Sequence, residues 1–507
     1  MLETMKEGAG LDESLKNEKL MEATIDQIHQ YMEDRELTSR ELVEFYLKRI
    51  EAYDQKGPKI NAVIKINSKA LSIAEELDKE YKKSGLAGPL HGIPVLLKDN
   101  VDIKDMETTA GSLSLKDFLP KEDAFITKRM KEAGAIILAK VNLHEFAVWG
   151  ETVSSILGQT INPYDLSRTP GGSSGGTGAG VASNFGMIGI GTDTINSIRS
   201  PASACSLAGI RPTVGLISRA GIVPYSITQD TAGPICRRVE DAVKFLDVIR
   251  GYDPEDPLTA WAYGKQRGSY VQHLKKDGLK GKRIGVLRSF FGKEKAHEQV
   301  NQVINKRLQD IQSFGAAVVD LEENINADQL INEVSVHLYE LKKELNEYLE
   351  ALGARSKVGS LEEIIESGNF HKGIEENIKI AQGLSIDTPE YQERLVKRKQ
   401  LRNHVMEIMA NYELDAVVYP HQKRPVVKVG EPQVDRNGVI GSVTGFPCCV
   451  VPGGFTEATA EAPGGIPVGI EFLAREWDEA TLIEIAYGFE QNTLCRTPPM
   501  NVPALES

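Results

Sequence analysis

The feature that most constrains this 507-residue sequence is the stretch 168–233, where glycine and serine cluster twice. The first cluster spans 171–176 and the second spans 191–197, with a helical and then an apolar run between them. A flexible glycine linker would not continue into core-type residues such as Val181 and Ile190. Glycines within a core pattern mark tight turns where the backbone closely approaches another group. We therefore expect two rigid loops, each of which presents a serine.

Composition narrows the class of protein. Apolar residues make up 41% of the chain and charged residues 26%, which is typical of a globular protein. The net charge of −13 argues against a nucleic-acid partner, because such proteins carry a basic surface. No run approaches 18 consecutive apolar residues, so we expect no contact with a membrane through a spanning helix. Residues 1–22 lack the apolar core of a signal peptide, and we interpret them as a polar N-terminal tail.

The chain has five cysteines, which is an odd number, and no two of them form a Cys-x-x-Cys motif. We interpret them as buried apolar thiols rather than as disulfides or zinc ligands. This usage fits a reducing compartment, so we expect a cytoplasmic location; a leader removed before residue 1 is left open.

Helical and strand patterns alternate along most of the chain, which predicts an α/β fold with a sheet flanked by helices. The range 325–412 departs from this alternation, because it is long, charged and helical. We expect a single domain over 23–507, in which 325–412 is a helical insertion or cap over a cleft. Predicted helices lie at 23–33, 39–53, 68–81, 125–133, 177–183, 295–314 and 479–491. Predicted strands lie at 61–66, 135–139, 186–190, 282–287, 316–321, 414–419, 447–451 and 469–473, and a further apolar strand leads into Lys98.

Lys98 is the candidate base for a serine nucleophile. On its own, a lysine at a strand end usually keeps its head in water. However, a serine needs a base, and none of the nine histidines has a recognisable nucleophile–base context. A neutral lysine can serve instead if burial lowers its pKa from about 10.4. A second hydroxyl could carry the proton between them, since a hydroxyl both accepts and donates.

Three motifs resemble the amidase signature family of serine hydrolases: Gly-Gly-Ser-Ser-Gly-Gly, Gly-Thr-Asp-Thr-x-x-Ser-Ile-Arg and Gly-Ile-Pro-x-x-x-Lys-Asp. The resemblance covers about 23–500 and implies a large mixed β-sheet with helices on both faces. It also implies that Ser197 is the acylated nucleophile, Ser173 a bridging serine after a cis peptide bond, and Lys98 the general base. The run 229–234 is most similar to the bacterial peptide-amidase branch.

The resemblance further implies that backbone N–H groups of the second loop form an oxyanion hole, with Ser174 also in contact with substrate. The candidate donors are Thr194, Ile195, Asn196 and Ser197. The commonest family pattern has Gly-Gly before the nucleophile, whereas this chain has Ile195-Asn196. Because isoleucine tolerates positive φ poorly, we expect that the turn does not need it.

Three neighbouring side chains have more than one interpretation. Asp193 is expected to accept N–H bonds of the turn rather than to take part in catalysis. Arg199 is consistent with a clamp for a substrate carboxylate or with a partner for a nearby acidic side chain. Cys205 is not expected to be a nucleophile, since it lacks a histidine partner.

These observations predict hydrolysis of a small-molecule carboxylic amide to an acid plus an amine or ammonia, through an acyl-enzyme. No metal or other cofactor is implied, and a homodimer is left open. One alternative is a glutamine amidotransferase A-type subunit, which makes ammonia for a partner enzyme. A second alternative is a catalytically weak binding protein on the same scaffold, motivated by Ile195-Asn196.

Overall fold

The computed structural model describes residues 13–265 and 268–505, so residues 1–12 of the expected tail lie outside it. The remainder of that tail is structured, in contrast to the expectation. Helix α1 spans Glu13–Leu20, and Leu20 is buried. Glu22 accepts a hydrogen bond of 2.6 Å from Arg496 Nε. The end of this segment is therefore attached to the rest of the molecule through an ion pair.

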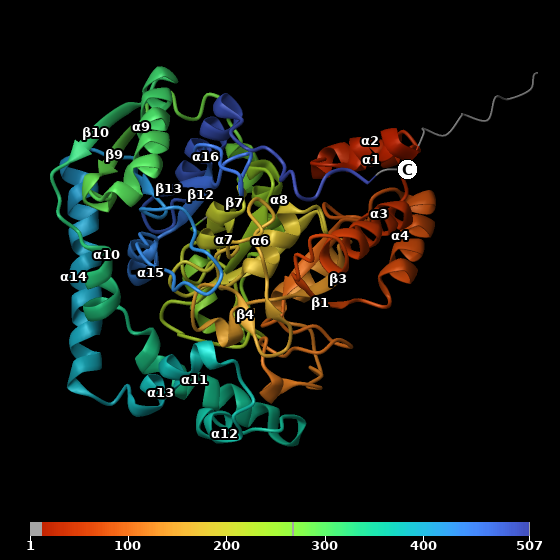
Figure 1. The fold of residues 1–507 in the computed structure, drawn as a ribbon, viewed down its shortest axis with the longest axis horizontal. Coiled ribbons are helices and arrows are strands. Elements are labelled where there is room, and N and C mark those ends of the chain that lie inside the picture. The colour runs from red at the N-terminus through yellow and green to blue at the C-terminus, as the bar shows by residue number, and fades with distance from the viewer. Residues whose placement is uncertain (1–12, 266–267, 506–507) are drawn as a thin grey trace, which may run out of the picture.

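The fold is built on a mixed sheet of 11 strands (Figure 1), in the order β1-β3-β2-β6-β8-β7-β12-β13-β11-β9-β10. Strand β2 runs parallel to both β3 and β6, and β9 runs parallel to β10 and β11. The other pairings are antiparallel, which makes the sheet mixed as predicted. The strands are β1 (Val63–Ile66), β2 (Pro94–Lys98), β3 (Ile136–Val141), β6 (Ile188–Asp193), β7 (Ala208–Arg211), β8 (Thr231–Cys236), β9 (Arg283–Leu287), β10 (Ala317–Leu321), β11 (Ala416–Pro420), β12 (Cys448–Phe455) and β13 (Pro467–Leu473), and a separate hairpin pairs β4 (Val153–Ser154) with β5 (Gly158–Gln159).

Helices flank the sheet, and several begin where the sequence predicts. Helix α3 starts after a capping box, in which Thr38 N donates to Glu41 Oε2 at 2.8 Å. Helix α14 starts with Pro389 in its first turn after the cap Thr388. The further helices are α2 (Ile25–Glu33), α3 (Ser39–Arg49), α4 (Ala70–Ser84), α5 (Phe125–Glu132), α6 (Gly175–Ala182), α7 (Arg199–Ala204), α8 (Val239–Ile249), α9 (Glu298–Ser313), α10 (Ala327–Gln329), α11 (His337–Leu352), α12 (Leu361–Ser367), α13 (Glu375–Gly383), α14 (Pro389–Asn411), α15 (Val439–Thr444) and α16 (Glu479–Thr493).

Three central elements were absent from the sequence prediction, namely β7, β8 and α8, and no bounds were predicted for the buried helix α7. Strands β7 and β8 lie in the middle of the sheet, and each residue in them is buried. Full burial removes the alternation of polar and apolar residues that identifies a half-exposed strand. Proline at positions 201 and 234 also obscures α7 and β8.

The predicted helical insertion leaves the sheet after β10 and returns at β11. Its helices α11, α12 and α13 lie together below the sheet in Figure 1, while α14 runs along the β9–β10 side. Apolar residues of α11–α13 share a core cluster with Phe146, Ala147 and Tyr225, which lie in loops at one end of the sheet. The insertion therefore packs against the loops at that end.

Arg49, at the end of α3, ties sequence-distant parts of the molecule together. Its buried guanidinium donates to the carbonyls of Ser183 (2.9 Å), Val502 (2.8 Å) and Pro503 (2.8 Å). Its pKa is lowered to about 10 by burial. The N-terminal helices and the segment near residue 502 thus close against each other.

Among the described residues, no helix combines the length and the apolar character needed to cross a lipid bilayer.

Candidate active site

Lys98, the last residue of β2, is carried into the interior by its strand and is fully buried. Its Nζ lies 2.8 Å from Ser173 Oγ and 2.7 Å from Thr192 Oγ1. Asn100 Nδ2 donates to the same Thr192 hydroxyl at 3.0 Å. The lysine head is therefore surrounded by hydroxyls rather than carboxylates.

Burial lowers the pKa of Lys98 from the ordinary 10.5 to about 7. Asp193 and Asp230 oppose this shift from a distance, but no carboxylate within the described chain forms an ion pair with Lys98. A lysine with a pKa near 7 is substantially neutral at physiological pH. Its amine can then accept a proton, which an ordinary surface lysine cannot do at that pH.

The first glycine–serine loop presents Ser173 to this amine. The peptide bond between Gly172 and Ser173 is cis, and Gly171 has a φ of +72°. A side chain on Gly172 would collide with the backbone of Gly150, only 2.8 Å away. Glycine is therefore required here by a close approach between two backbones, as the sequence suggested.

Ser174 lies in a different environment from the one expected. It is fully buried, and its hydroxyl donates to Thr192 O (3.2 Å) and accepts from Thr192 N (3.3 Å). Its own N–H donates to the carbonyl of Ser197 at 3.3 Å. The side chain thus holds the two loops together, and its hydroxyl is not available to a substrate.

The second loop follows β6 and carries Ser197. Neither Ile195 nor Asn196 has a positive φ, as predicted. Within the described chain, the backbone N–H groups of Ile195, Asn196 and Ser197 make no hydrogen bond to protein acceptors. Three consecutive free N–H groups beside a serine are suitable donors for an oxyanion. The backbone N–H of Thr194 likewise makes no hydrogen bond within the described chain, while its side chain donates to Asp230 Oδ1 at 2.5 Å.

A buried ionic network supports the second loop from below. Arg199 donates to Asp193 Oδ2 at 3.0 Å and to the carbonyl of Ile195 at 2.7 Å. It also pairs with Glu471 Oε1 at 2.5 Å. Arg199 is thus a partner of acidic side chains and not a substrate clamp. Asp193 also accepts from Ile198 N at 3.1 Å, so the structural role expected for it is confirmed.

Lys98 is hydrogen-bonded to Ser173, but Ser173 is not hydrogen-bonded to Ser197 in the same way. Across the described residues, no hydrogen bond links the hydroxyls of Ser173 and Ser197; their loops meet through Ser174 N. Sequence reasoning missed Thr192, which bonds Lys98. Its place in β6, opposite β2 in a parallel pair, required knowledge of the strand order.

Cys205 caps α7 and is fully buried, and burial raises the pKa of its thiol. It is therefore unsuited to act as a nucleophile. All five cysteines are free.

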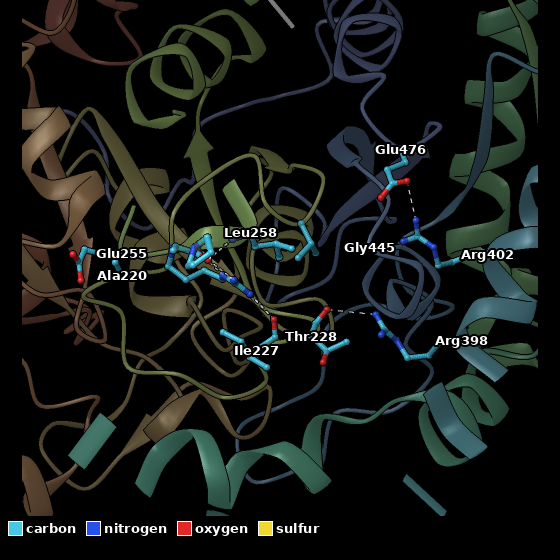
Figure 2. Close-up of a pocket in the computed structure, with 13 residues that line it drawn as sticks. Ala220, Ile227, Thr228, Glu255, Leu258, Arg398, Arg402, Gly445 and Glu476 are labelled. Atoms are coloured by element: carbon cyan, nitrogen blue, oxygen red, sulfur yellow. Dashed lines mark hydrogen bonds and ion pairs between the residues drawn. The ribbon is translucent and has the colours of Figure 1, made fainter. Parts of the chain in front are cut away.

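A cavity of about 640 Å³ lies away from the serine loops, between α14 and the loops around residues 219–228 and 255–258 (Figure 2). Arg398 donates to the carbonyl of Thr228 at 3.4 Å, and Arg402 pairs with Glu476 at 2.8 Å. None of Lys98, Ser173 and Ser197 lines it. A search for the candidate active site by cavity size alone would therefore point to the wrong place.

Comparison with known proteins identifies the family of this chain. The model of the Amidase family matches residues 41–483. A probable amidase of Arabidopsis thaliana is 37% identical over 95% of this chain and 92% of its own length. The A-type subunit of the glutamyl-tRNA(Gln) amidotransferase from Thermoanaerobacter pseudethanolicus is 31% identical over 96% of this chain and 99% of its own.

Solved structures agree with the sequence relatives. The crystal structure of a peptide amidase from Stenotrophomonas maltophilia superposes with a TM-score of 0.86 at 36% identity, covering 94% of this chain and 98% of that one. An amidase family protein from Bacillus anthracis gives a TM-score of 0.86 at 31% identity, covering 97% and 95%. This chain belongs to the amidase signature family, and it is an amidase.

Proposed function

We propose that this enzyme hydrolyses linear carboxylic amides through Lys98, Ser173 and Ser197. The observation that carries the proposal is the 2.8 Å contact between the buried amine of Lys98, with its pKa near 7, and the hydroxyl of Ser173. Neutral Lys98 takes the Ser173 proton while Ser173 takes the Ser197 proton, and Ser197 Oγ attacks the amide carbonyl. The free N–H groups of Ile195, Asn196 and Ser197 stabilise the oxyanion.

Collapse of this intermediate returns the proton through Ser173 to the leaving nitrogen, which departs as an amine or ammonia. Water then attacks the ester on Ser197 and gives its proton to the same relay, which releases the acid. Rotation about χ1 reorients a serine hydroxyl, and catalytic hydrogen bonds are often loose before substrate binds. The relay therefore requires the two hydroxyls to meet only in the substrate complex.

Covalent labelling tests the assignment of the nucleophile. A fluorophosphonate probe is expected to add to Ser197, as located by mass spectrometry of the labelled peptide. Labelling should be lost in Ser197→Ala and strongly slowed in Lys98→Ala. Full labelling at another serine, or unchanged labelling of Lys98→Ala, would contradict the relay.

The relatives also include amidotransferase subunits, so ammonia production from glutamine is a second candidate function. The test is release of ammonia from free glutamine compared with a panel of aryl, alkyl and peptide amides. Turnover of glutamine alone, raised by amidotransferase partner subunits, would favour this second candidate.

We also propose that described residues 23–505 form one domain in which 325–412 covers the cleft. The cluster that α11–α13 share with Phe146 and Tyr225 supports this arrangement. The free cysteines support a cytoplasmic location, because disulfides are rare in reducing compartments.

A further inference from the structure

Arg436 is a cation that forms no ion pair among the described residues, on a segment next to the serine loops. It is half-buried, and burial lowers its pKa. No side-chain hydrogen bond or ion pair of its guanidinium occurs within 13–265 and 268–505, in contrast to its neighbour Arg424, which pairs with Asp435 at 2.5 Å. Desolvating a charge without a partner is unfavourable. Such a group is therefore suited to receive a negative charge from a ligand.

The guanidinium of Arg436 lies over the ring of Trp149, with 4.6 Å between the guanidinium carbon and the ring centroid. Trp149 precedes Gly150, whose backbone approaches Gly172 of the cis turn. On the same loop, Glu151 N donates to His144 Nδ1 at 3.1 Å, and His144 N donates to the carbonyl of Ser173 at 2.9 Å. The aromatic face under Arg436 thus belongs to the loop that contacts the bridging serine.

The segment that carries Arg436 also contacts the other serine loop. A Cβ on Gly438 would lie 3.0 Å from Asn196 Cβ, next to Ser197 in the sequence. Gln433, in the same segment, is buried, and both polar atoms of its side-chain amide have no partner among the described residues. Arg436 therefore lies in a segment that borders both serine loops, with an unsatisfied amide nearby.

Two carboxylates act on Arg436 without forming an ion pair with it. Glu151 acts on Arg436 electrostatically but lies beyond ion-pair distance, and burial raises its own pKa. The effect of Asp328 is smaller than that of Glu151. On the insertion, His337 stacks edge-on against Tyr225 with 5.4 Å between centroids, and burial, Arg436 and Arg394 together lower its pKa to about 3. His337 is therefore neutral at physiological pH and adds no charge beside Arg436.

We propose that Arg436 and Trp149 form a specificity subsite for a carboxylate on the acyl part of the amide substrate. A guanidinium presents a planar fork that pairs with a carboxylate through two hydrogen bonds. The Trp149 ring holds the fork in place by stacking, which lowers the entropy lost on binding. This inference rests on the proposed function and names a substrate class for it: primary amides whose acyl group ends in a carboxylate.

The test uses two primary amides of equal shape, N-succinyl-phenylalaninamide and N-levulinoyl-phenylalaninamide. The second replaces the carboxylate by a neutral methyl ketone, and both release ammonia, so the anion can lie only in the acyl part. We expect kcat/KM of the native enzyme to be about tenfold higher or more for the succinyl amide, as for one charge-assisted pair. Arg436→Met should reduce the preference to within about twofold and leave the levulinoyl rate within about threefold, while Arg436→Lys should be intermediate.

Arg424→Met is the matched control, since Arg424 lies on the same segment but is already paired with Asp435. It should keep the preference. Absence of a preference in the native enzyme, or an equal loss of both substrates in Arg436→Met, would overturn the subsite.

A binding measurement separates this result from failure of the proposed function. In Ser197→Ala, the succinyl amide should quench tryptophan fluorescence, and Arg436→Met in that background should weaken binding about tenfold. If native enzyme turns over neither amide but this binding difference persists, the reaction assignment fails and the subsite stands. If turnover proceeds without any binding difference, the subsite fails alone.

Discussion

Two buried lysines on adjacent strands show how one fold gives the same side chain different surroundings. Lys98 ends β2 and Lys140 lies in β3, and both are fully buried. Lys140 Nζ lies 3.2 Å from Asp99 Oδ1 and donates to the carbonyl of Val101 at 2.6 Å. Lys98 contacts hydroxyls and, within the described chain, no carboxylate.

The difference lies in the counter-charge. Burial lowers the pKa of both lysines, but Asp99 and Asp102 favour the charged form of Lys140 at close range. Around Lys98 only the more distant Asp193 and Asp230 do so, and its pKa falls to about 7. A paired lysine is a structural cation, whereas an unpaired one is a base.

The largest expected effect is on turnover. Lys98→Met should lower kcat/KM by about 10³-fold, since general base catalysis contributes on that order. Lys140→Met should stay within about tenfold of native enzyme at a temperature where it remains folded. Amide hydrolysis with purified variants, checked by circular dichroism, measures both. Equal losses in the two variants would remove the functional distinction.

Stability should change in opposite directions. Lys140→Met leaves Asp99 as a buried, uncompensated charge, which should cost about 3 kcal/mol of unfolding free energy. The double variant Lys140→Met/Asp99→Asn should recover most of this lost unfolding free energy. Lys98→Met should instead stabilise the protein at pH 6, because a fall in pKa from 10.5 to about 7 corresponds to about 5 kcal/mol as an upper bound. Denaturant unfolding gives both values.

The pH dependence of that stabilisation has a definite sign. Since the folded pKa of Lys98 lies below its unfolded value, the unfolded chain binds more protons between about pH 7 and 10.5. Native stability from this group therefore rises with pH across that window, and the full penalty remains below about pH 7. The advantage of Lys98→Met should accordingly shrink as pH rises above 7, and a constant advantage would contradict the assigned pKa.

The rate should follow the neutral fraction of Lys98. With a pKa near 7, kcat/KM should rise about a hundredfold from pH 5 to pH 8 and then level off. Initial rates in buffers of constant ionic strength measure the profile. A flat profile over this range would count against an unpaired lysine as the base.

The smallest expected effect comes from the hydroxyls around each lysine. Thr192→Val removes a 2.7 Å contact of Lys98 and should lower kcat about tenfold. It should also move the acid limb of the profile to lower pH, because the ammonium form loses an acceptor. Thr108→Val removes the 3.1 Å contact of Lys140 and serves as the matched control, with an unchanged profile. Equal shifts of the pH–rate profile in Thr192→Val and Thr108→Val would contradict a specific role of the Thr192 hydroxyl.

The sequence predicted a base at Lys98, but it did not predict the groups that surround Lys98. Lys98 could be placed at a strand end from the apolar run before it, and its burial followed from the need for a base. The hydroxyl of Thr192 could not be found, because it reaches Lys98 only through the pairing of β2 with β6, in which Val95 lies opposite Ile188. Long-range pairing of this kind leaves no local pattern.

A similar contrast holds for the fold. Elements with a clear period, such as α9 and β9, were predicted within a few residues. The central strands β7 and β8 were not, because burial on both faces hides their period. Arg199 was ambiguous for the same reason as Thr192: its partner Glu471 lies 272 residues away.

The hydrogen bonds of Arg49 to distant carbonyls have a consequence for folding during synthesis. One of its acceptors, the carbonyl of Val502, is 453 residues further along the chain. During translation, the first helices leave the ribosome long before that carbonyl exists, and the guanidinium stays hydrated until it emerges. The contact between α3 and the segment near residue 502 can therefore form only late in synthesis.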